Sequence, residues 1–311
     1  MKHVIIDTDP GIDDALALLL AFNSPELRIE AVTTVSGNVS QQKAHVNALK
    51  LLDFIGVGKL PVAMGAEKPL QREPMYAEEF HGVTGLGDAM LPEPKIKSDE
   101  RSATQLIFDI VEEFEDELTI IAVGPLTNIA SSLLLDAKKV EKIEELVIMG
   151  GAFHLTPHGY GNATPVAEFN VWHDPLAAKI VFDSRLRIKV VGLDVTTDPK
   201  NRLAKQAFYD ILEANNRKTR LISNLCQRLV DKFDGMNLHD PMAIAVTIDE
   251  DLAQTEKFRV EVETQSELTL GQTIIDRRKH KPIGRDPNAE ICTSIDSEKF
   301  LKMFMERIAK E

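Results

Sequence analysis

The chain has few cysteines and a shortage of positive charge. Only Cys226 and Cys292 occur in 311 residues, and they form no CxxC pair. This excludes a disulfide framework and a zinc ribbon, and it suits a reducing compartment. The formal net charge of −13 argues against nucleic-acid backbones and anionic membrane surfaces as partners.

Long apolar runs are also lacking near the N-terminus. The longest one, residues 15–22, is far shorter than the roughly 20 residues of a membrane helix. Met1-Lys2-His3 leads straight into a predicted strand, which leaves no room for a signal peptide. We therefore expect a cytoplasmic protein that contacts neither nucleic acid nor membrane.

Apolar runs alternate with helix-like segments along the chain. We expect strands at residues 3–7, 28–35, 61–63, 118–123, 144–149 and 187–193. We expect helices at residues 13–22, 40–55, 102–114, 127–134, 174–182 and 201–213. This order predicts an α/β fold in one large domain, residues 1–311, with a mostly parallel, Rossmann-like open sheet and helices on both faces. Ligands of such sheets bind at the carboxyl ends of the strands.

Two segments depart from this alternation. Residues 66–101 contain four prolines and three glycines and predict a long loop, which in a compact domain is usually a lid or a binding loop. His81 lies among the glycines of this loop, which can present its ring to a ligand. Residues 215–240 are polar and helix-like, and we interpret them as a flap.

Four carboxylates follow the first predicted strand. Asp7, Asp9, Asp13 and Asp14 lie within eight positions, between the strand end at residues 4–6 and an apolar helix. Acids this close repel one another unless a cation or protons neutralise them. The turn therefore predicts a site for a hard cation.

Other predicted strands end in small or polar residues. Gly37-Asn38 follows the second strand, Gly124-Pro125-Leu126-Thr127-Asn128 the fourth, and Gly150-Gly151 the fifth. Thr127 is a candidate cap for the next helix. Because parallel strands end at one edge, these turns together predict the floor of a pocket.

A further polar group comes from residues 161–170. We expect Glu168 and Asn170 to share one face of an extended segment, and with Asn162 they suit a neutral polyhydroxyl ligand. An edge strand with solvated side chains is the alternative, and it is commoner for such a segment taken alone. For His239 and Asp240, the alternatives are a structural histidine and a helix N-cap.

With these residues in hand, the chain resembles the inosine–uridine-preferring nucleoside hydrolases over essentially its whole length. Its motifs follow one another in that family's order: Asp7-Thr8-Asp9-Pro10-Gly11-Ile12-Asp13-Asp14-Ala15, Gly37-Asn38, Gly124-Pro125-Leu126-Thr127-Asn128, Met149-Gly150-Gly151, Ala167-Glu168-Phe169-Asn170 and His239-Asp240.

The resemblance implies a ribonucleoside hydrolase that holds one Ca²⁺ and forms homo-oligomers, either dimers or tetramers. By resemblance, the calcium ligands are Asp9, Asp14, the Thr127 carbonyl and Asp240. The ribose-binding positions are Asp13, Asn162, Glu168 and Asn170, with Met149 nearby. Asn38 matches a position close to the attacking water, Asp7 lies behind the site, and His81 and His239 lie near the base.

The expected reaction passes through an oxocarbenium-like ribosyl centre. We expect Asp9 to act as general base on water and His239 to protonate or hydrogen-bond the leaving base. Gln227 is a candidate for contacting the base edge and Phe233 for stacking, which favours pyrimidine nucleosides such as uridine and cytidine. A merely solvated Gln227 is an equally good interpretation.

Two rival functions fit parts of the sequence. A haloacid-dehalogenase-like Mg²⁺ phosphatase also has Asp-x-Asp after its first strand, but not the following Pro10-Gly11 and Asp13-Asp14. A non-catalytic, calcium-dependent sugar-binding protein is the second. An EF-hand is excluded because its glycine and closing glutamate are misplaced.

Overall fold

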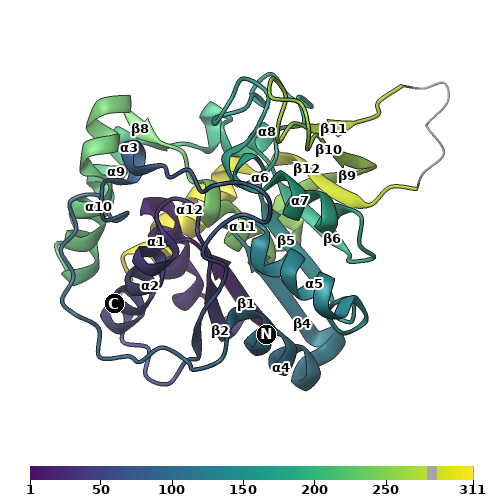
Figure 1. Ribbon diagram of the computed structural model, residues 1–311. Coiled ribbons are helices and arrows are strands. Elements are labelled where there is room, and N and C mark those ends of the chain that lie inside the picture. Colours follow the sequence, from purple (N-terminus) through teal and green to yellow (C-terminus); the bar gives the residue numbers. More distant parts are fainter. Residues whose placement is uncertain (279–285, 311) are drawn as a thin grey trace.

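The computed structural model describes residues 1–278 and 286–310. In these residues the main sheet has eight strands, and its neighbouring pairs are parallel except for the last. The strand order across the sheet is β3 (Val62–Met64), β2 (Leu27–Thr34), β1 (Lys2–Thr8), β4 (Leu118–Ala122), β5 (Glu145–Met149), β6 (Ile188–Val191), β12 (Ala289–Ile295) and β9 (Ala253–Phe258). The predicted single α/β domain with a mostly parallel sheet is confirmed (Figure 1).

Two hydrophobic clusters lie on opposite faces of the sheet, because successive strand residues point to opposite sides. In β1, Val4 and Ile6 belong to one cluster and Ile5 to the other. The first cluster includes residues of α1 (Ile12–Phe22), α2 (Gln41–Ile55), α9 (Lys205–Leu212), α10 (Arg217–Phe233), α11 (His239–Ile248) and α12 (Ser297–Ile308). The second includes residues of α4 (Ala103–Phe114), α5 (Thr127–Val140) and α7 (Pro175–Phe182).

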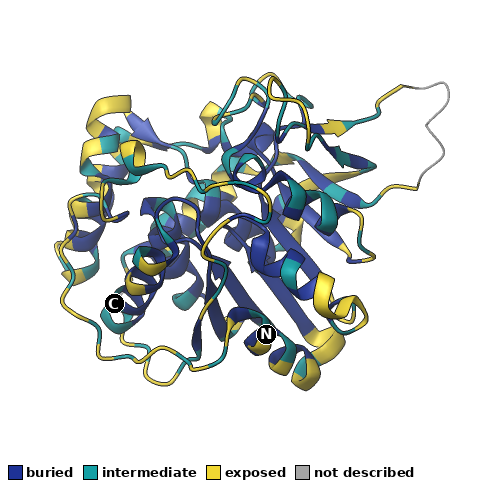
Figure 2. Cartoon of the chain, in the orientation of Figure 1, coloured by how far each residue is buried: buried dark blue, intermediate teal, exposed yellow. Residues whose placement is uncertain are grey.

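Helix α1 holds the acidic turn between β1 and α1 in the middle of the molecule. Residues 14–21 are all buried, and the helix packs against α2, α11 and α12 as well as the sheet. A helix that is apolar on every side is stable only in such surroundings. The dark-blue ribbons of Figure 2 show this buried centre. The buried helix therefore holds the preceding turn in a fixed position.

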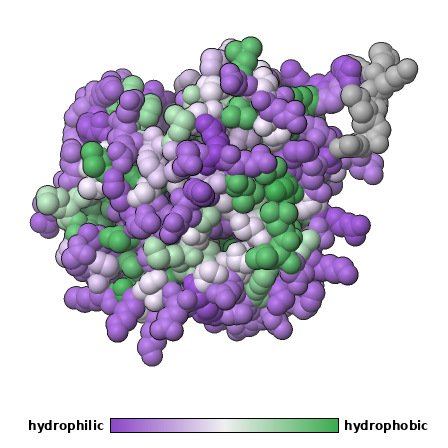
Figure 3. Space-filling model, in the orientation of Figure 1, coloured by the Kyte–Doolittle hydropathy of each residue, from purple (hydrophilic) through white to green (hydrophobic). Residues whose placement is uncertain are grey.

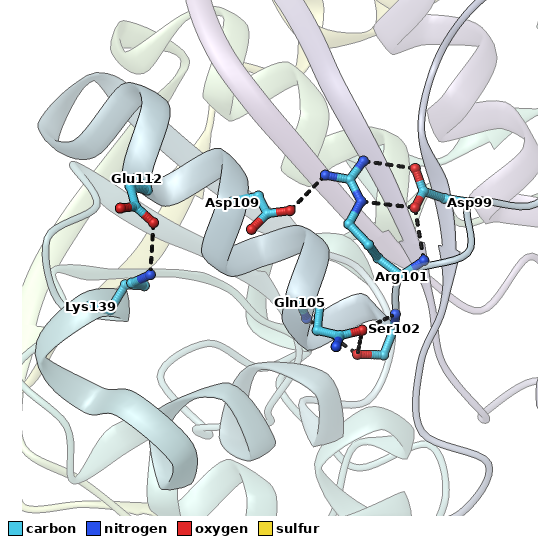
Figure 4. A network of polar contacts seen from close by, with 7 residues as sticks. All are labelled: Asp99, Arg101, Ser102, Gln105, Asp109, Glu112 and Lys139. Carbon is cyan, nitrogen blue, oxygen red and sulfur yellow. Dashed lines mark hydrogen bonds and ion pairs between the residues drawn. The ribbon is translucent and has the colours of Figure 1, made fainter.

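The N-terminus of α4 shows how sequence signals set an element's boundary. Ser102 and Gln105 form a reciprocal capping box with the backbone N–H groups of each other, as expected for a helix that starts at this position. Arg101 pairs with both Asp99 and Asp109, which ties the end of the 66–101 loop to the helix (Figure 4).

The remaining predicted elements agree with the structure except at two helix boundaries, one of which is the end of the helix predicted at 127–134, since α5 continues to Val140. All six predicted strands belong to the sheet, residues 66–101 contain only the short helix α3 (Glu78–His81), and residues 215–240 contain α10. The helix predicted at 201–213 begins only at Lys205, because η2 (Pro199–Asn201) and the ladder between β7 (Leu203–Ala204) and β8 (Gly235–Met236) precede it.

The other short elements complete the description: η1 (Glu115–Glu117), α6 (Phe169–His173), α8 (Leu193–Thr196), η3 (Glu250–Leu252), β10 (Val260–Val262) and β11 (Thr273–Ile275). The face of the molecule in Figure 3 is mainly hydrophilic, with separate hydrophobic patches. Among the described residues, no helix has the length and apolar character needed to cross a membrane.

Candidate active site

Asp14 is locked into the turn between β1 and α1. Its carboxylate accepts hydrogen bonds from the Thr8 hydroxyl at 2.5 Å, the Gly11 amide at 2.8 Å and the Asn38 side-chain amide at 3.0 Å. Burial, followed by the charge of Asp13, raises its pKa. The bonds fix its orientation, and the raised pKa records how poorly this place tolerates an uncompensated negative charge.

Asp9 lies beside Asp14 and keeps one oxygen unpaired. Its Oδ2 accepts a hydrogen bond from the backbone N–H of Asn38 at 2.6 Å, whereas its Oδ1 is buried without a hydrogen-bond partner among the described residues. Burial raises the pKa of Asp9 well above its ordinary value, and the charge of Asp14 raises it further. A buried carboxylate oxygen without a protein partner is rare, and a bound water or ion is the usual explanation.

The glycines of two motifs pack directly against the Asp9 carboxylate. A Cβ atom on Gly37 or on Gly124 would collide with the Asp9 carboxylate. The turns after β2 and β4 thus close around this side chain, which explains physically why glycine occurs at these two strand ends.

Three carboxylates from two helices form a candidate metal centre. Asp13, Asp14 and Asp240 each offer an oxygen, and these oxygens lie within 4.8 Å of one another. Burial and the neighbouring acids raise the pKa of Asp240 well above its ordinary value. Asp9 is not a member of this closest group. The oxygen-only donor set and the repulsion that a cation would relieve both fit a hard divalent metal.

Asp7 lies one layer below, inside the sheet. Its Oδ1 accepts the Thr33 hydroxyl at 2.5 Å and the Asn128 amide at 2.7 Å, while burial raises its pKa to about 7. It contacts β2 and α5 rather than the cavity, which agrees with its predicted place behind the site.

Glu168 and Asn170 join the tips of β4 and β5 to helix α6. The Glu168 carboxylate accepts backbone N–H groups of Gly151, Asn170 and Val171 at 2.7–3.0 Å. The Asn170 amide donates to the carbonyls of Val123 and Met149, at 2.8 and 3.1 Å. The predicted extended segment is wrong here: Glu168 caps α6, and Asn170 lies within that helix.

A cavity of about 560 Å³ opens above these groups. Among the predicted site residues, its walls contain Asp13, Asn38, His81, Met149, Asn162, Glu168, Asn170, His239 and Asp240. Phe80 of the 66–101 loop, together with Leu229 and Phe233 of α10, adds apolar surface. The cavity therefore combines buried carboxylates and amides with an apolar wall, as expected for a polar sugar joined to a flat ring.

Both histidines are oriented by neighbouring groups. The His81 Nδ1 atom accepts the Ile12 amide at 3.0 Å, and burial lowers its pKa to about 4. His239 pairs through Nδ1 with the Thr196 hydroxyl at 2.8 Å, and burial lowers its pKa as well. Each ring is therefore neutral near pH 7.

The sequence model of the "Inosine-uridine preferring nucleoside hydrolase" family matches residues 4–302. The chain belongs to this family. It is therefore a hydrolase that acts on the N-glycosyl bonds of ribonucleosides.

Individual members of the nucleoside hydrolase family are similar along their full length. The chain is 42% identical to "Uridine nucleosidase 1" of Arabidopsis thaliana, over 92% of this chain and 86% of that protein. It is 38% identical to "Pyrimidine-specific ribonucleoside hydrolase RihA" of Shewanella sp. (strain ANA-3), over 99% and 96%. A solved structure, "Plant nucleoside hydrolase - PpNRh1 enzyme", superposes with a TM-score of 0.91 at 32% identity and covers 100% of this chain and 99% of that one.

Five predicted residues of this nucleoside hydrolase are not among those that line the cavity: Asp7, Asp9, Asp14, Thr127 and Gln227. Gln227 bonds to Tyr209 and Asp231 on the outer side of α10, because it lies two positions from Leu229 and thus on the far side of the helix. Its predicted contact with the base is not made by this arrangement. Thr127 is not the helix cap either: the N-cap residue is Leu126, and the Thr127 hydroxyl donates to Asp174 at 2.8 Å.

The alternative interpretation of Asp240 as a helix N-cap is also wrong, since the N-cap residue of α11 is Leu238. Several cavity residues could not be predicted from the sequence, because they lie in loops and short elements without a periodic pattern: Val123, Phe169, Thr197, Pro199, Arg202, Met236 and Asn237. The one available signal was proximity in sequence, because Asn237 lies two positions before His239.

Proposed function

We propose that this nucleoside hydrolase uses one Ca²⁺ and an Asp9-activated water to release ribose and a free base, with a preference for pyrimidine nucleosides. One observation carries the proposal: carboxylate oxygens of Asp13, Asp14 and Asp240 lie within 4.8 Å of one another beside the cavity, and the buried Oδ1 atom of neighbouring Asp9 has no hydrogen-bond partner among the described residues.

The chain offers oxygen donors for the metal. Asp9, Asp14 and Asp240 would hold it through carboxylates and Thr127 through its carbonyl, and Ca²⁺ favours such oxygen sets. When bound, the cation neutralises the carboxylates, and it orients a water molecule and lowers its pKa. The unpaired Asp9 Oδ1 atom supports this donor set.

Asp9 is suited to take the proton from the attacking water. The Asn38 backbone amide occupies its Oδ2 atom, which leaves Oδ1 to face both the metal and the attacking water. A carboxylate whose pKa is raised by burial is a stronger base than one in water. The proton passes from water to Oδ1 as the oxygen attacks the anomeric carbon.

The ribosyl ring develops positive charge as the bond to the base breaks. The carboxylates of half-buried Asp13 and buried Glu168, both in the cavity wall, stabilise this charge and accept hydrogen bonds from ribose hydroxyls. Asn170 and Asn162 complete the sugar subsite through their amides, beside Met149.

The base lies against the apolar wall. Phe233 and Phe80 offer aromatic faces, and His239 and His81 offer hydrogen bonds to the leaving base. The printed names of two relatives, a uridine nucleosidase and a pyrimidine-specific hydrolase, favour pyrimidines for this chain.

A reducing-sugar assay tests the function. The protein is incubated with uridine, cytidine, inosine and adenosine, each with and without a calcium chelator, and then with Ca²⁺ or Mg²⁺ added back. We expect ribose release, fastest from pyrimidine nucleosides and lost on chelation. Absence of ribose from every nucleoside would overturn the proposal, and hydrolysis of a phosphomonoester instead would favour the phosphatase.

Two further predictions concern the protein in the cell. We propose a cytoplasmic homo-oligomer, a dimer or a tetramer. Cys226 and Cys292 are both buried free thiols, which suits a reducing compartment. Leu134 and Leu135 of α5 are 62% and 72% exposed, and such apolar surface favours association. Light scattering after gel filtration measures the state directly.

A further inference from the structure

Two polar side chains in the cavity wall have no part in the proposed mechanism. Arg202 and Asn237 both line the cavity. They flank the β7–β8 ladder, in which Leu203 pairs with Met236 and Ala204 with Gly235. One residue further along this antiparallel register, Arg202 stands opposite Asn237, so the two side chains belong to one part of the wall.

Asn237 presents an acceptor without a donor. Its Oδ1 atom is buried and has no hydrogen-bond partner among the described residues. A buried amide oxygen in this state is unfavourable in the free protein. Because the Asn237 residue lines the cavity, a rotation of its side-chain amide would bring this oxygen to a donor on the substrate.

Arg202 presents donors on a guanidinium that is already held in place. Its Nη2 atom donates to the carbonyls of Phe233 and Gly235, at 2.9 and 3.0 Å, at the end of α10. A guanidinium has five N–H groups and no acceptor. Within the described residues, no hydrogen bond uses its Nε or Nη1 atoms.

We propose that Asn237 and Arg202 recognise the edge of the nucleobase and select a ring N–H beside a carbonyl, as in uracil, over a ring nitrogen beside an amino group, as in cytosine. The inference rests on the proposed function, because it assumes a ribonucleoside in this cavity. The Asn237 Oδ1 atom accepts the ring N–H, and Arg202 donates to the C4 carbonyl, the position at which cytosine has its amino group, rather than to the C2 carbonyl that both bases share.

The two residues contribute differently to the choice. An amide can turn over and donate to the ring nitrogen of cytosine, so Asn237 alone discriminates weakly. Arg202 cannot accept a hydrogen bond from the cytosine amino group, and this donor-against-donor contact disfavours cytidine. Selection therefore needs both side chains.

The test compares kcat/KM for uridine, cytidine and p-nitrophenyl riboside, whose leaving group has no such edge. Asn237→Ala should lower the value for uridine about ten- to hundredfold, mainly through KM, and leave the nitrophenyl substrate unchanged. Arg202→Met should reduce the uridine-to-cytidine ratio. Asn237→Asp, which keeps the acceptor and removes the donor, should raise that ratio. Gln227→Ala is the matched control, since it removes an amide outside the cavity.

The outcomes separate this inference from the proposed function. If the wild-type protein cleaves none of the three substrates, the proposed function fails. If it cleaves them, but Asn237→Ala lowers uridine and the nitrophenyl riboside equally, or the uridine-to-cytidine ratio stays constant in Arg202→Met and Asn237→Asp, edge recognition by these residues is overturned.

Discussion

Replacing Gly124 by alanine should disable the enzyme while leaving it folded. The new Cβ atom would lie 2.6 Å from the Asp9 Oδ1 atom and 2.9 Å from a Val35 methyl carbon, whereas ordinary contacts begin at 3.4 Å. The Asp9 carboxylate must therefore move by roughly 0.8 Å, which is 3.4 minus 2.6. A displacement of about 1 Å in a reacting group can lower the rate about a hundredfold.

The effect on stability should be smaller than the effect on catalysis. Overpacking of a buried site usually costs about 1–3 kcal/mol, out of a typical total of about 5–15 kcal/mol. We expect kcat/KM for ribose release from uridine to fall about a hundredfold or more, with a modest decrease in Tm.

Gly58→Ala is the matched control, because a Cβ atom at Gly58 meets nothing within 4 Å. It should retain full activity. The reasoning is refuted if Gly124→Ala, folded by circular dichroism, keeps kcat/KM within about threefold of the wild type.

Three other changes test the roles of the cavity residues and of the metal. His239→Ala should lower turnover of nucleosides without loss of bound calcium, as measured by assay and calorimetry; full turnover on every nucleoside would contradict its role at the leaving base. Glu168→Gln places an amide donor against a backbone N–H donor, so the free energy of unfolding should fall by about 1–3 kcal/mol in a denaturant titration; an unchanged value would refute that accounting. Removal of Ca²⁺ should lower Tm, and its return at about a hundred times Kd should restore about 2.7 kcal/mol; a chelator-insensitive Tm would exclude the metal centre.

The elements found from the sequence are those whose burial imposes a pattern. The central strands are apolar runs, and α1 is apolar from Ala15 to Phe22, so both can be predicted from the sequence. The edge strand β9 is antiparallel and has four exposed residues among its six, so it carries no apolar run, and it was not predicted. Strand β12 was missed beside it, and the two pair with each other.

The site likewise has a part that the sequence predicts and a part that it does not. Its polar floor was predictable because parallel strands end at one edge, and Asp14, Asn38 and Glu168 all follow or adjoin strand ends. Its apolar wall depends on the rotation of α10 about its axis, which placed Phe233 in the cavity and Gln227 outside it. The amphipathic pattern predicts a helix here, but it does not say which face meets a ligand.

The division of labour between Asp13 and Asp14 follows from helix geometry. Neighbouring helical residues point about 100° apart, so one lines the cavity while the other turns toward Thr8 and Gly11. Asp14 is satisfied by the protein, but its charge still raises the pKa of Asp9 and Asp240. The fold holds these acids together through a buried helix that cannot relax outward. The repulsion is therefore stored in the apoprotein, and any cation that relieves it must stabilise the fold as it binds.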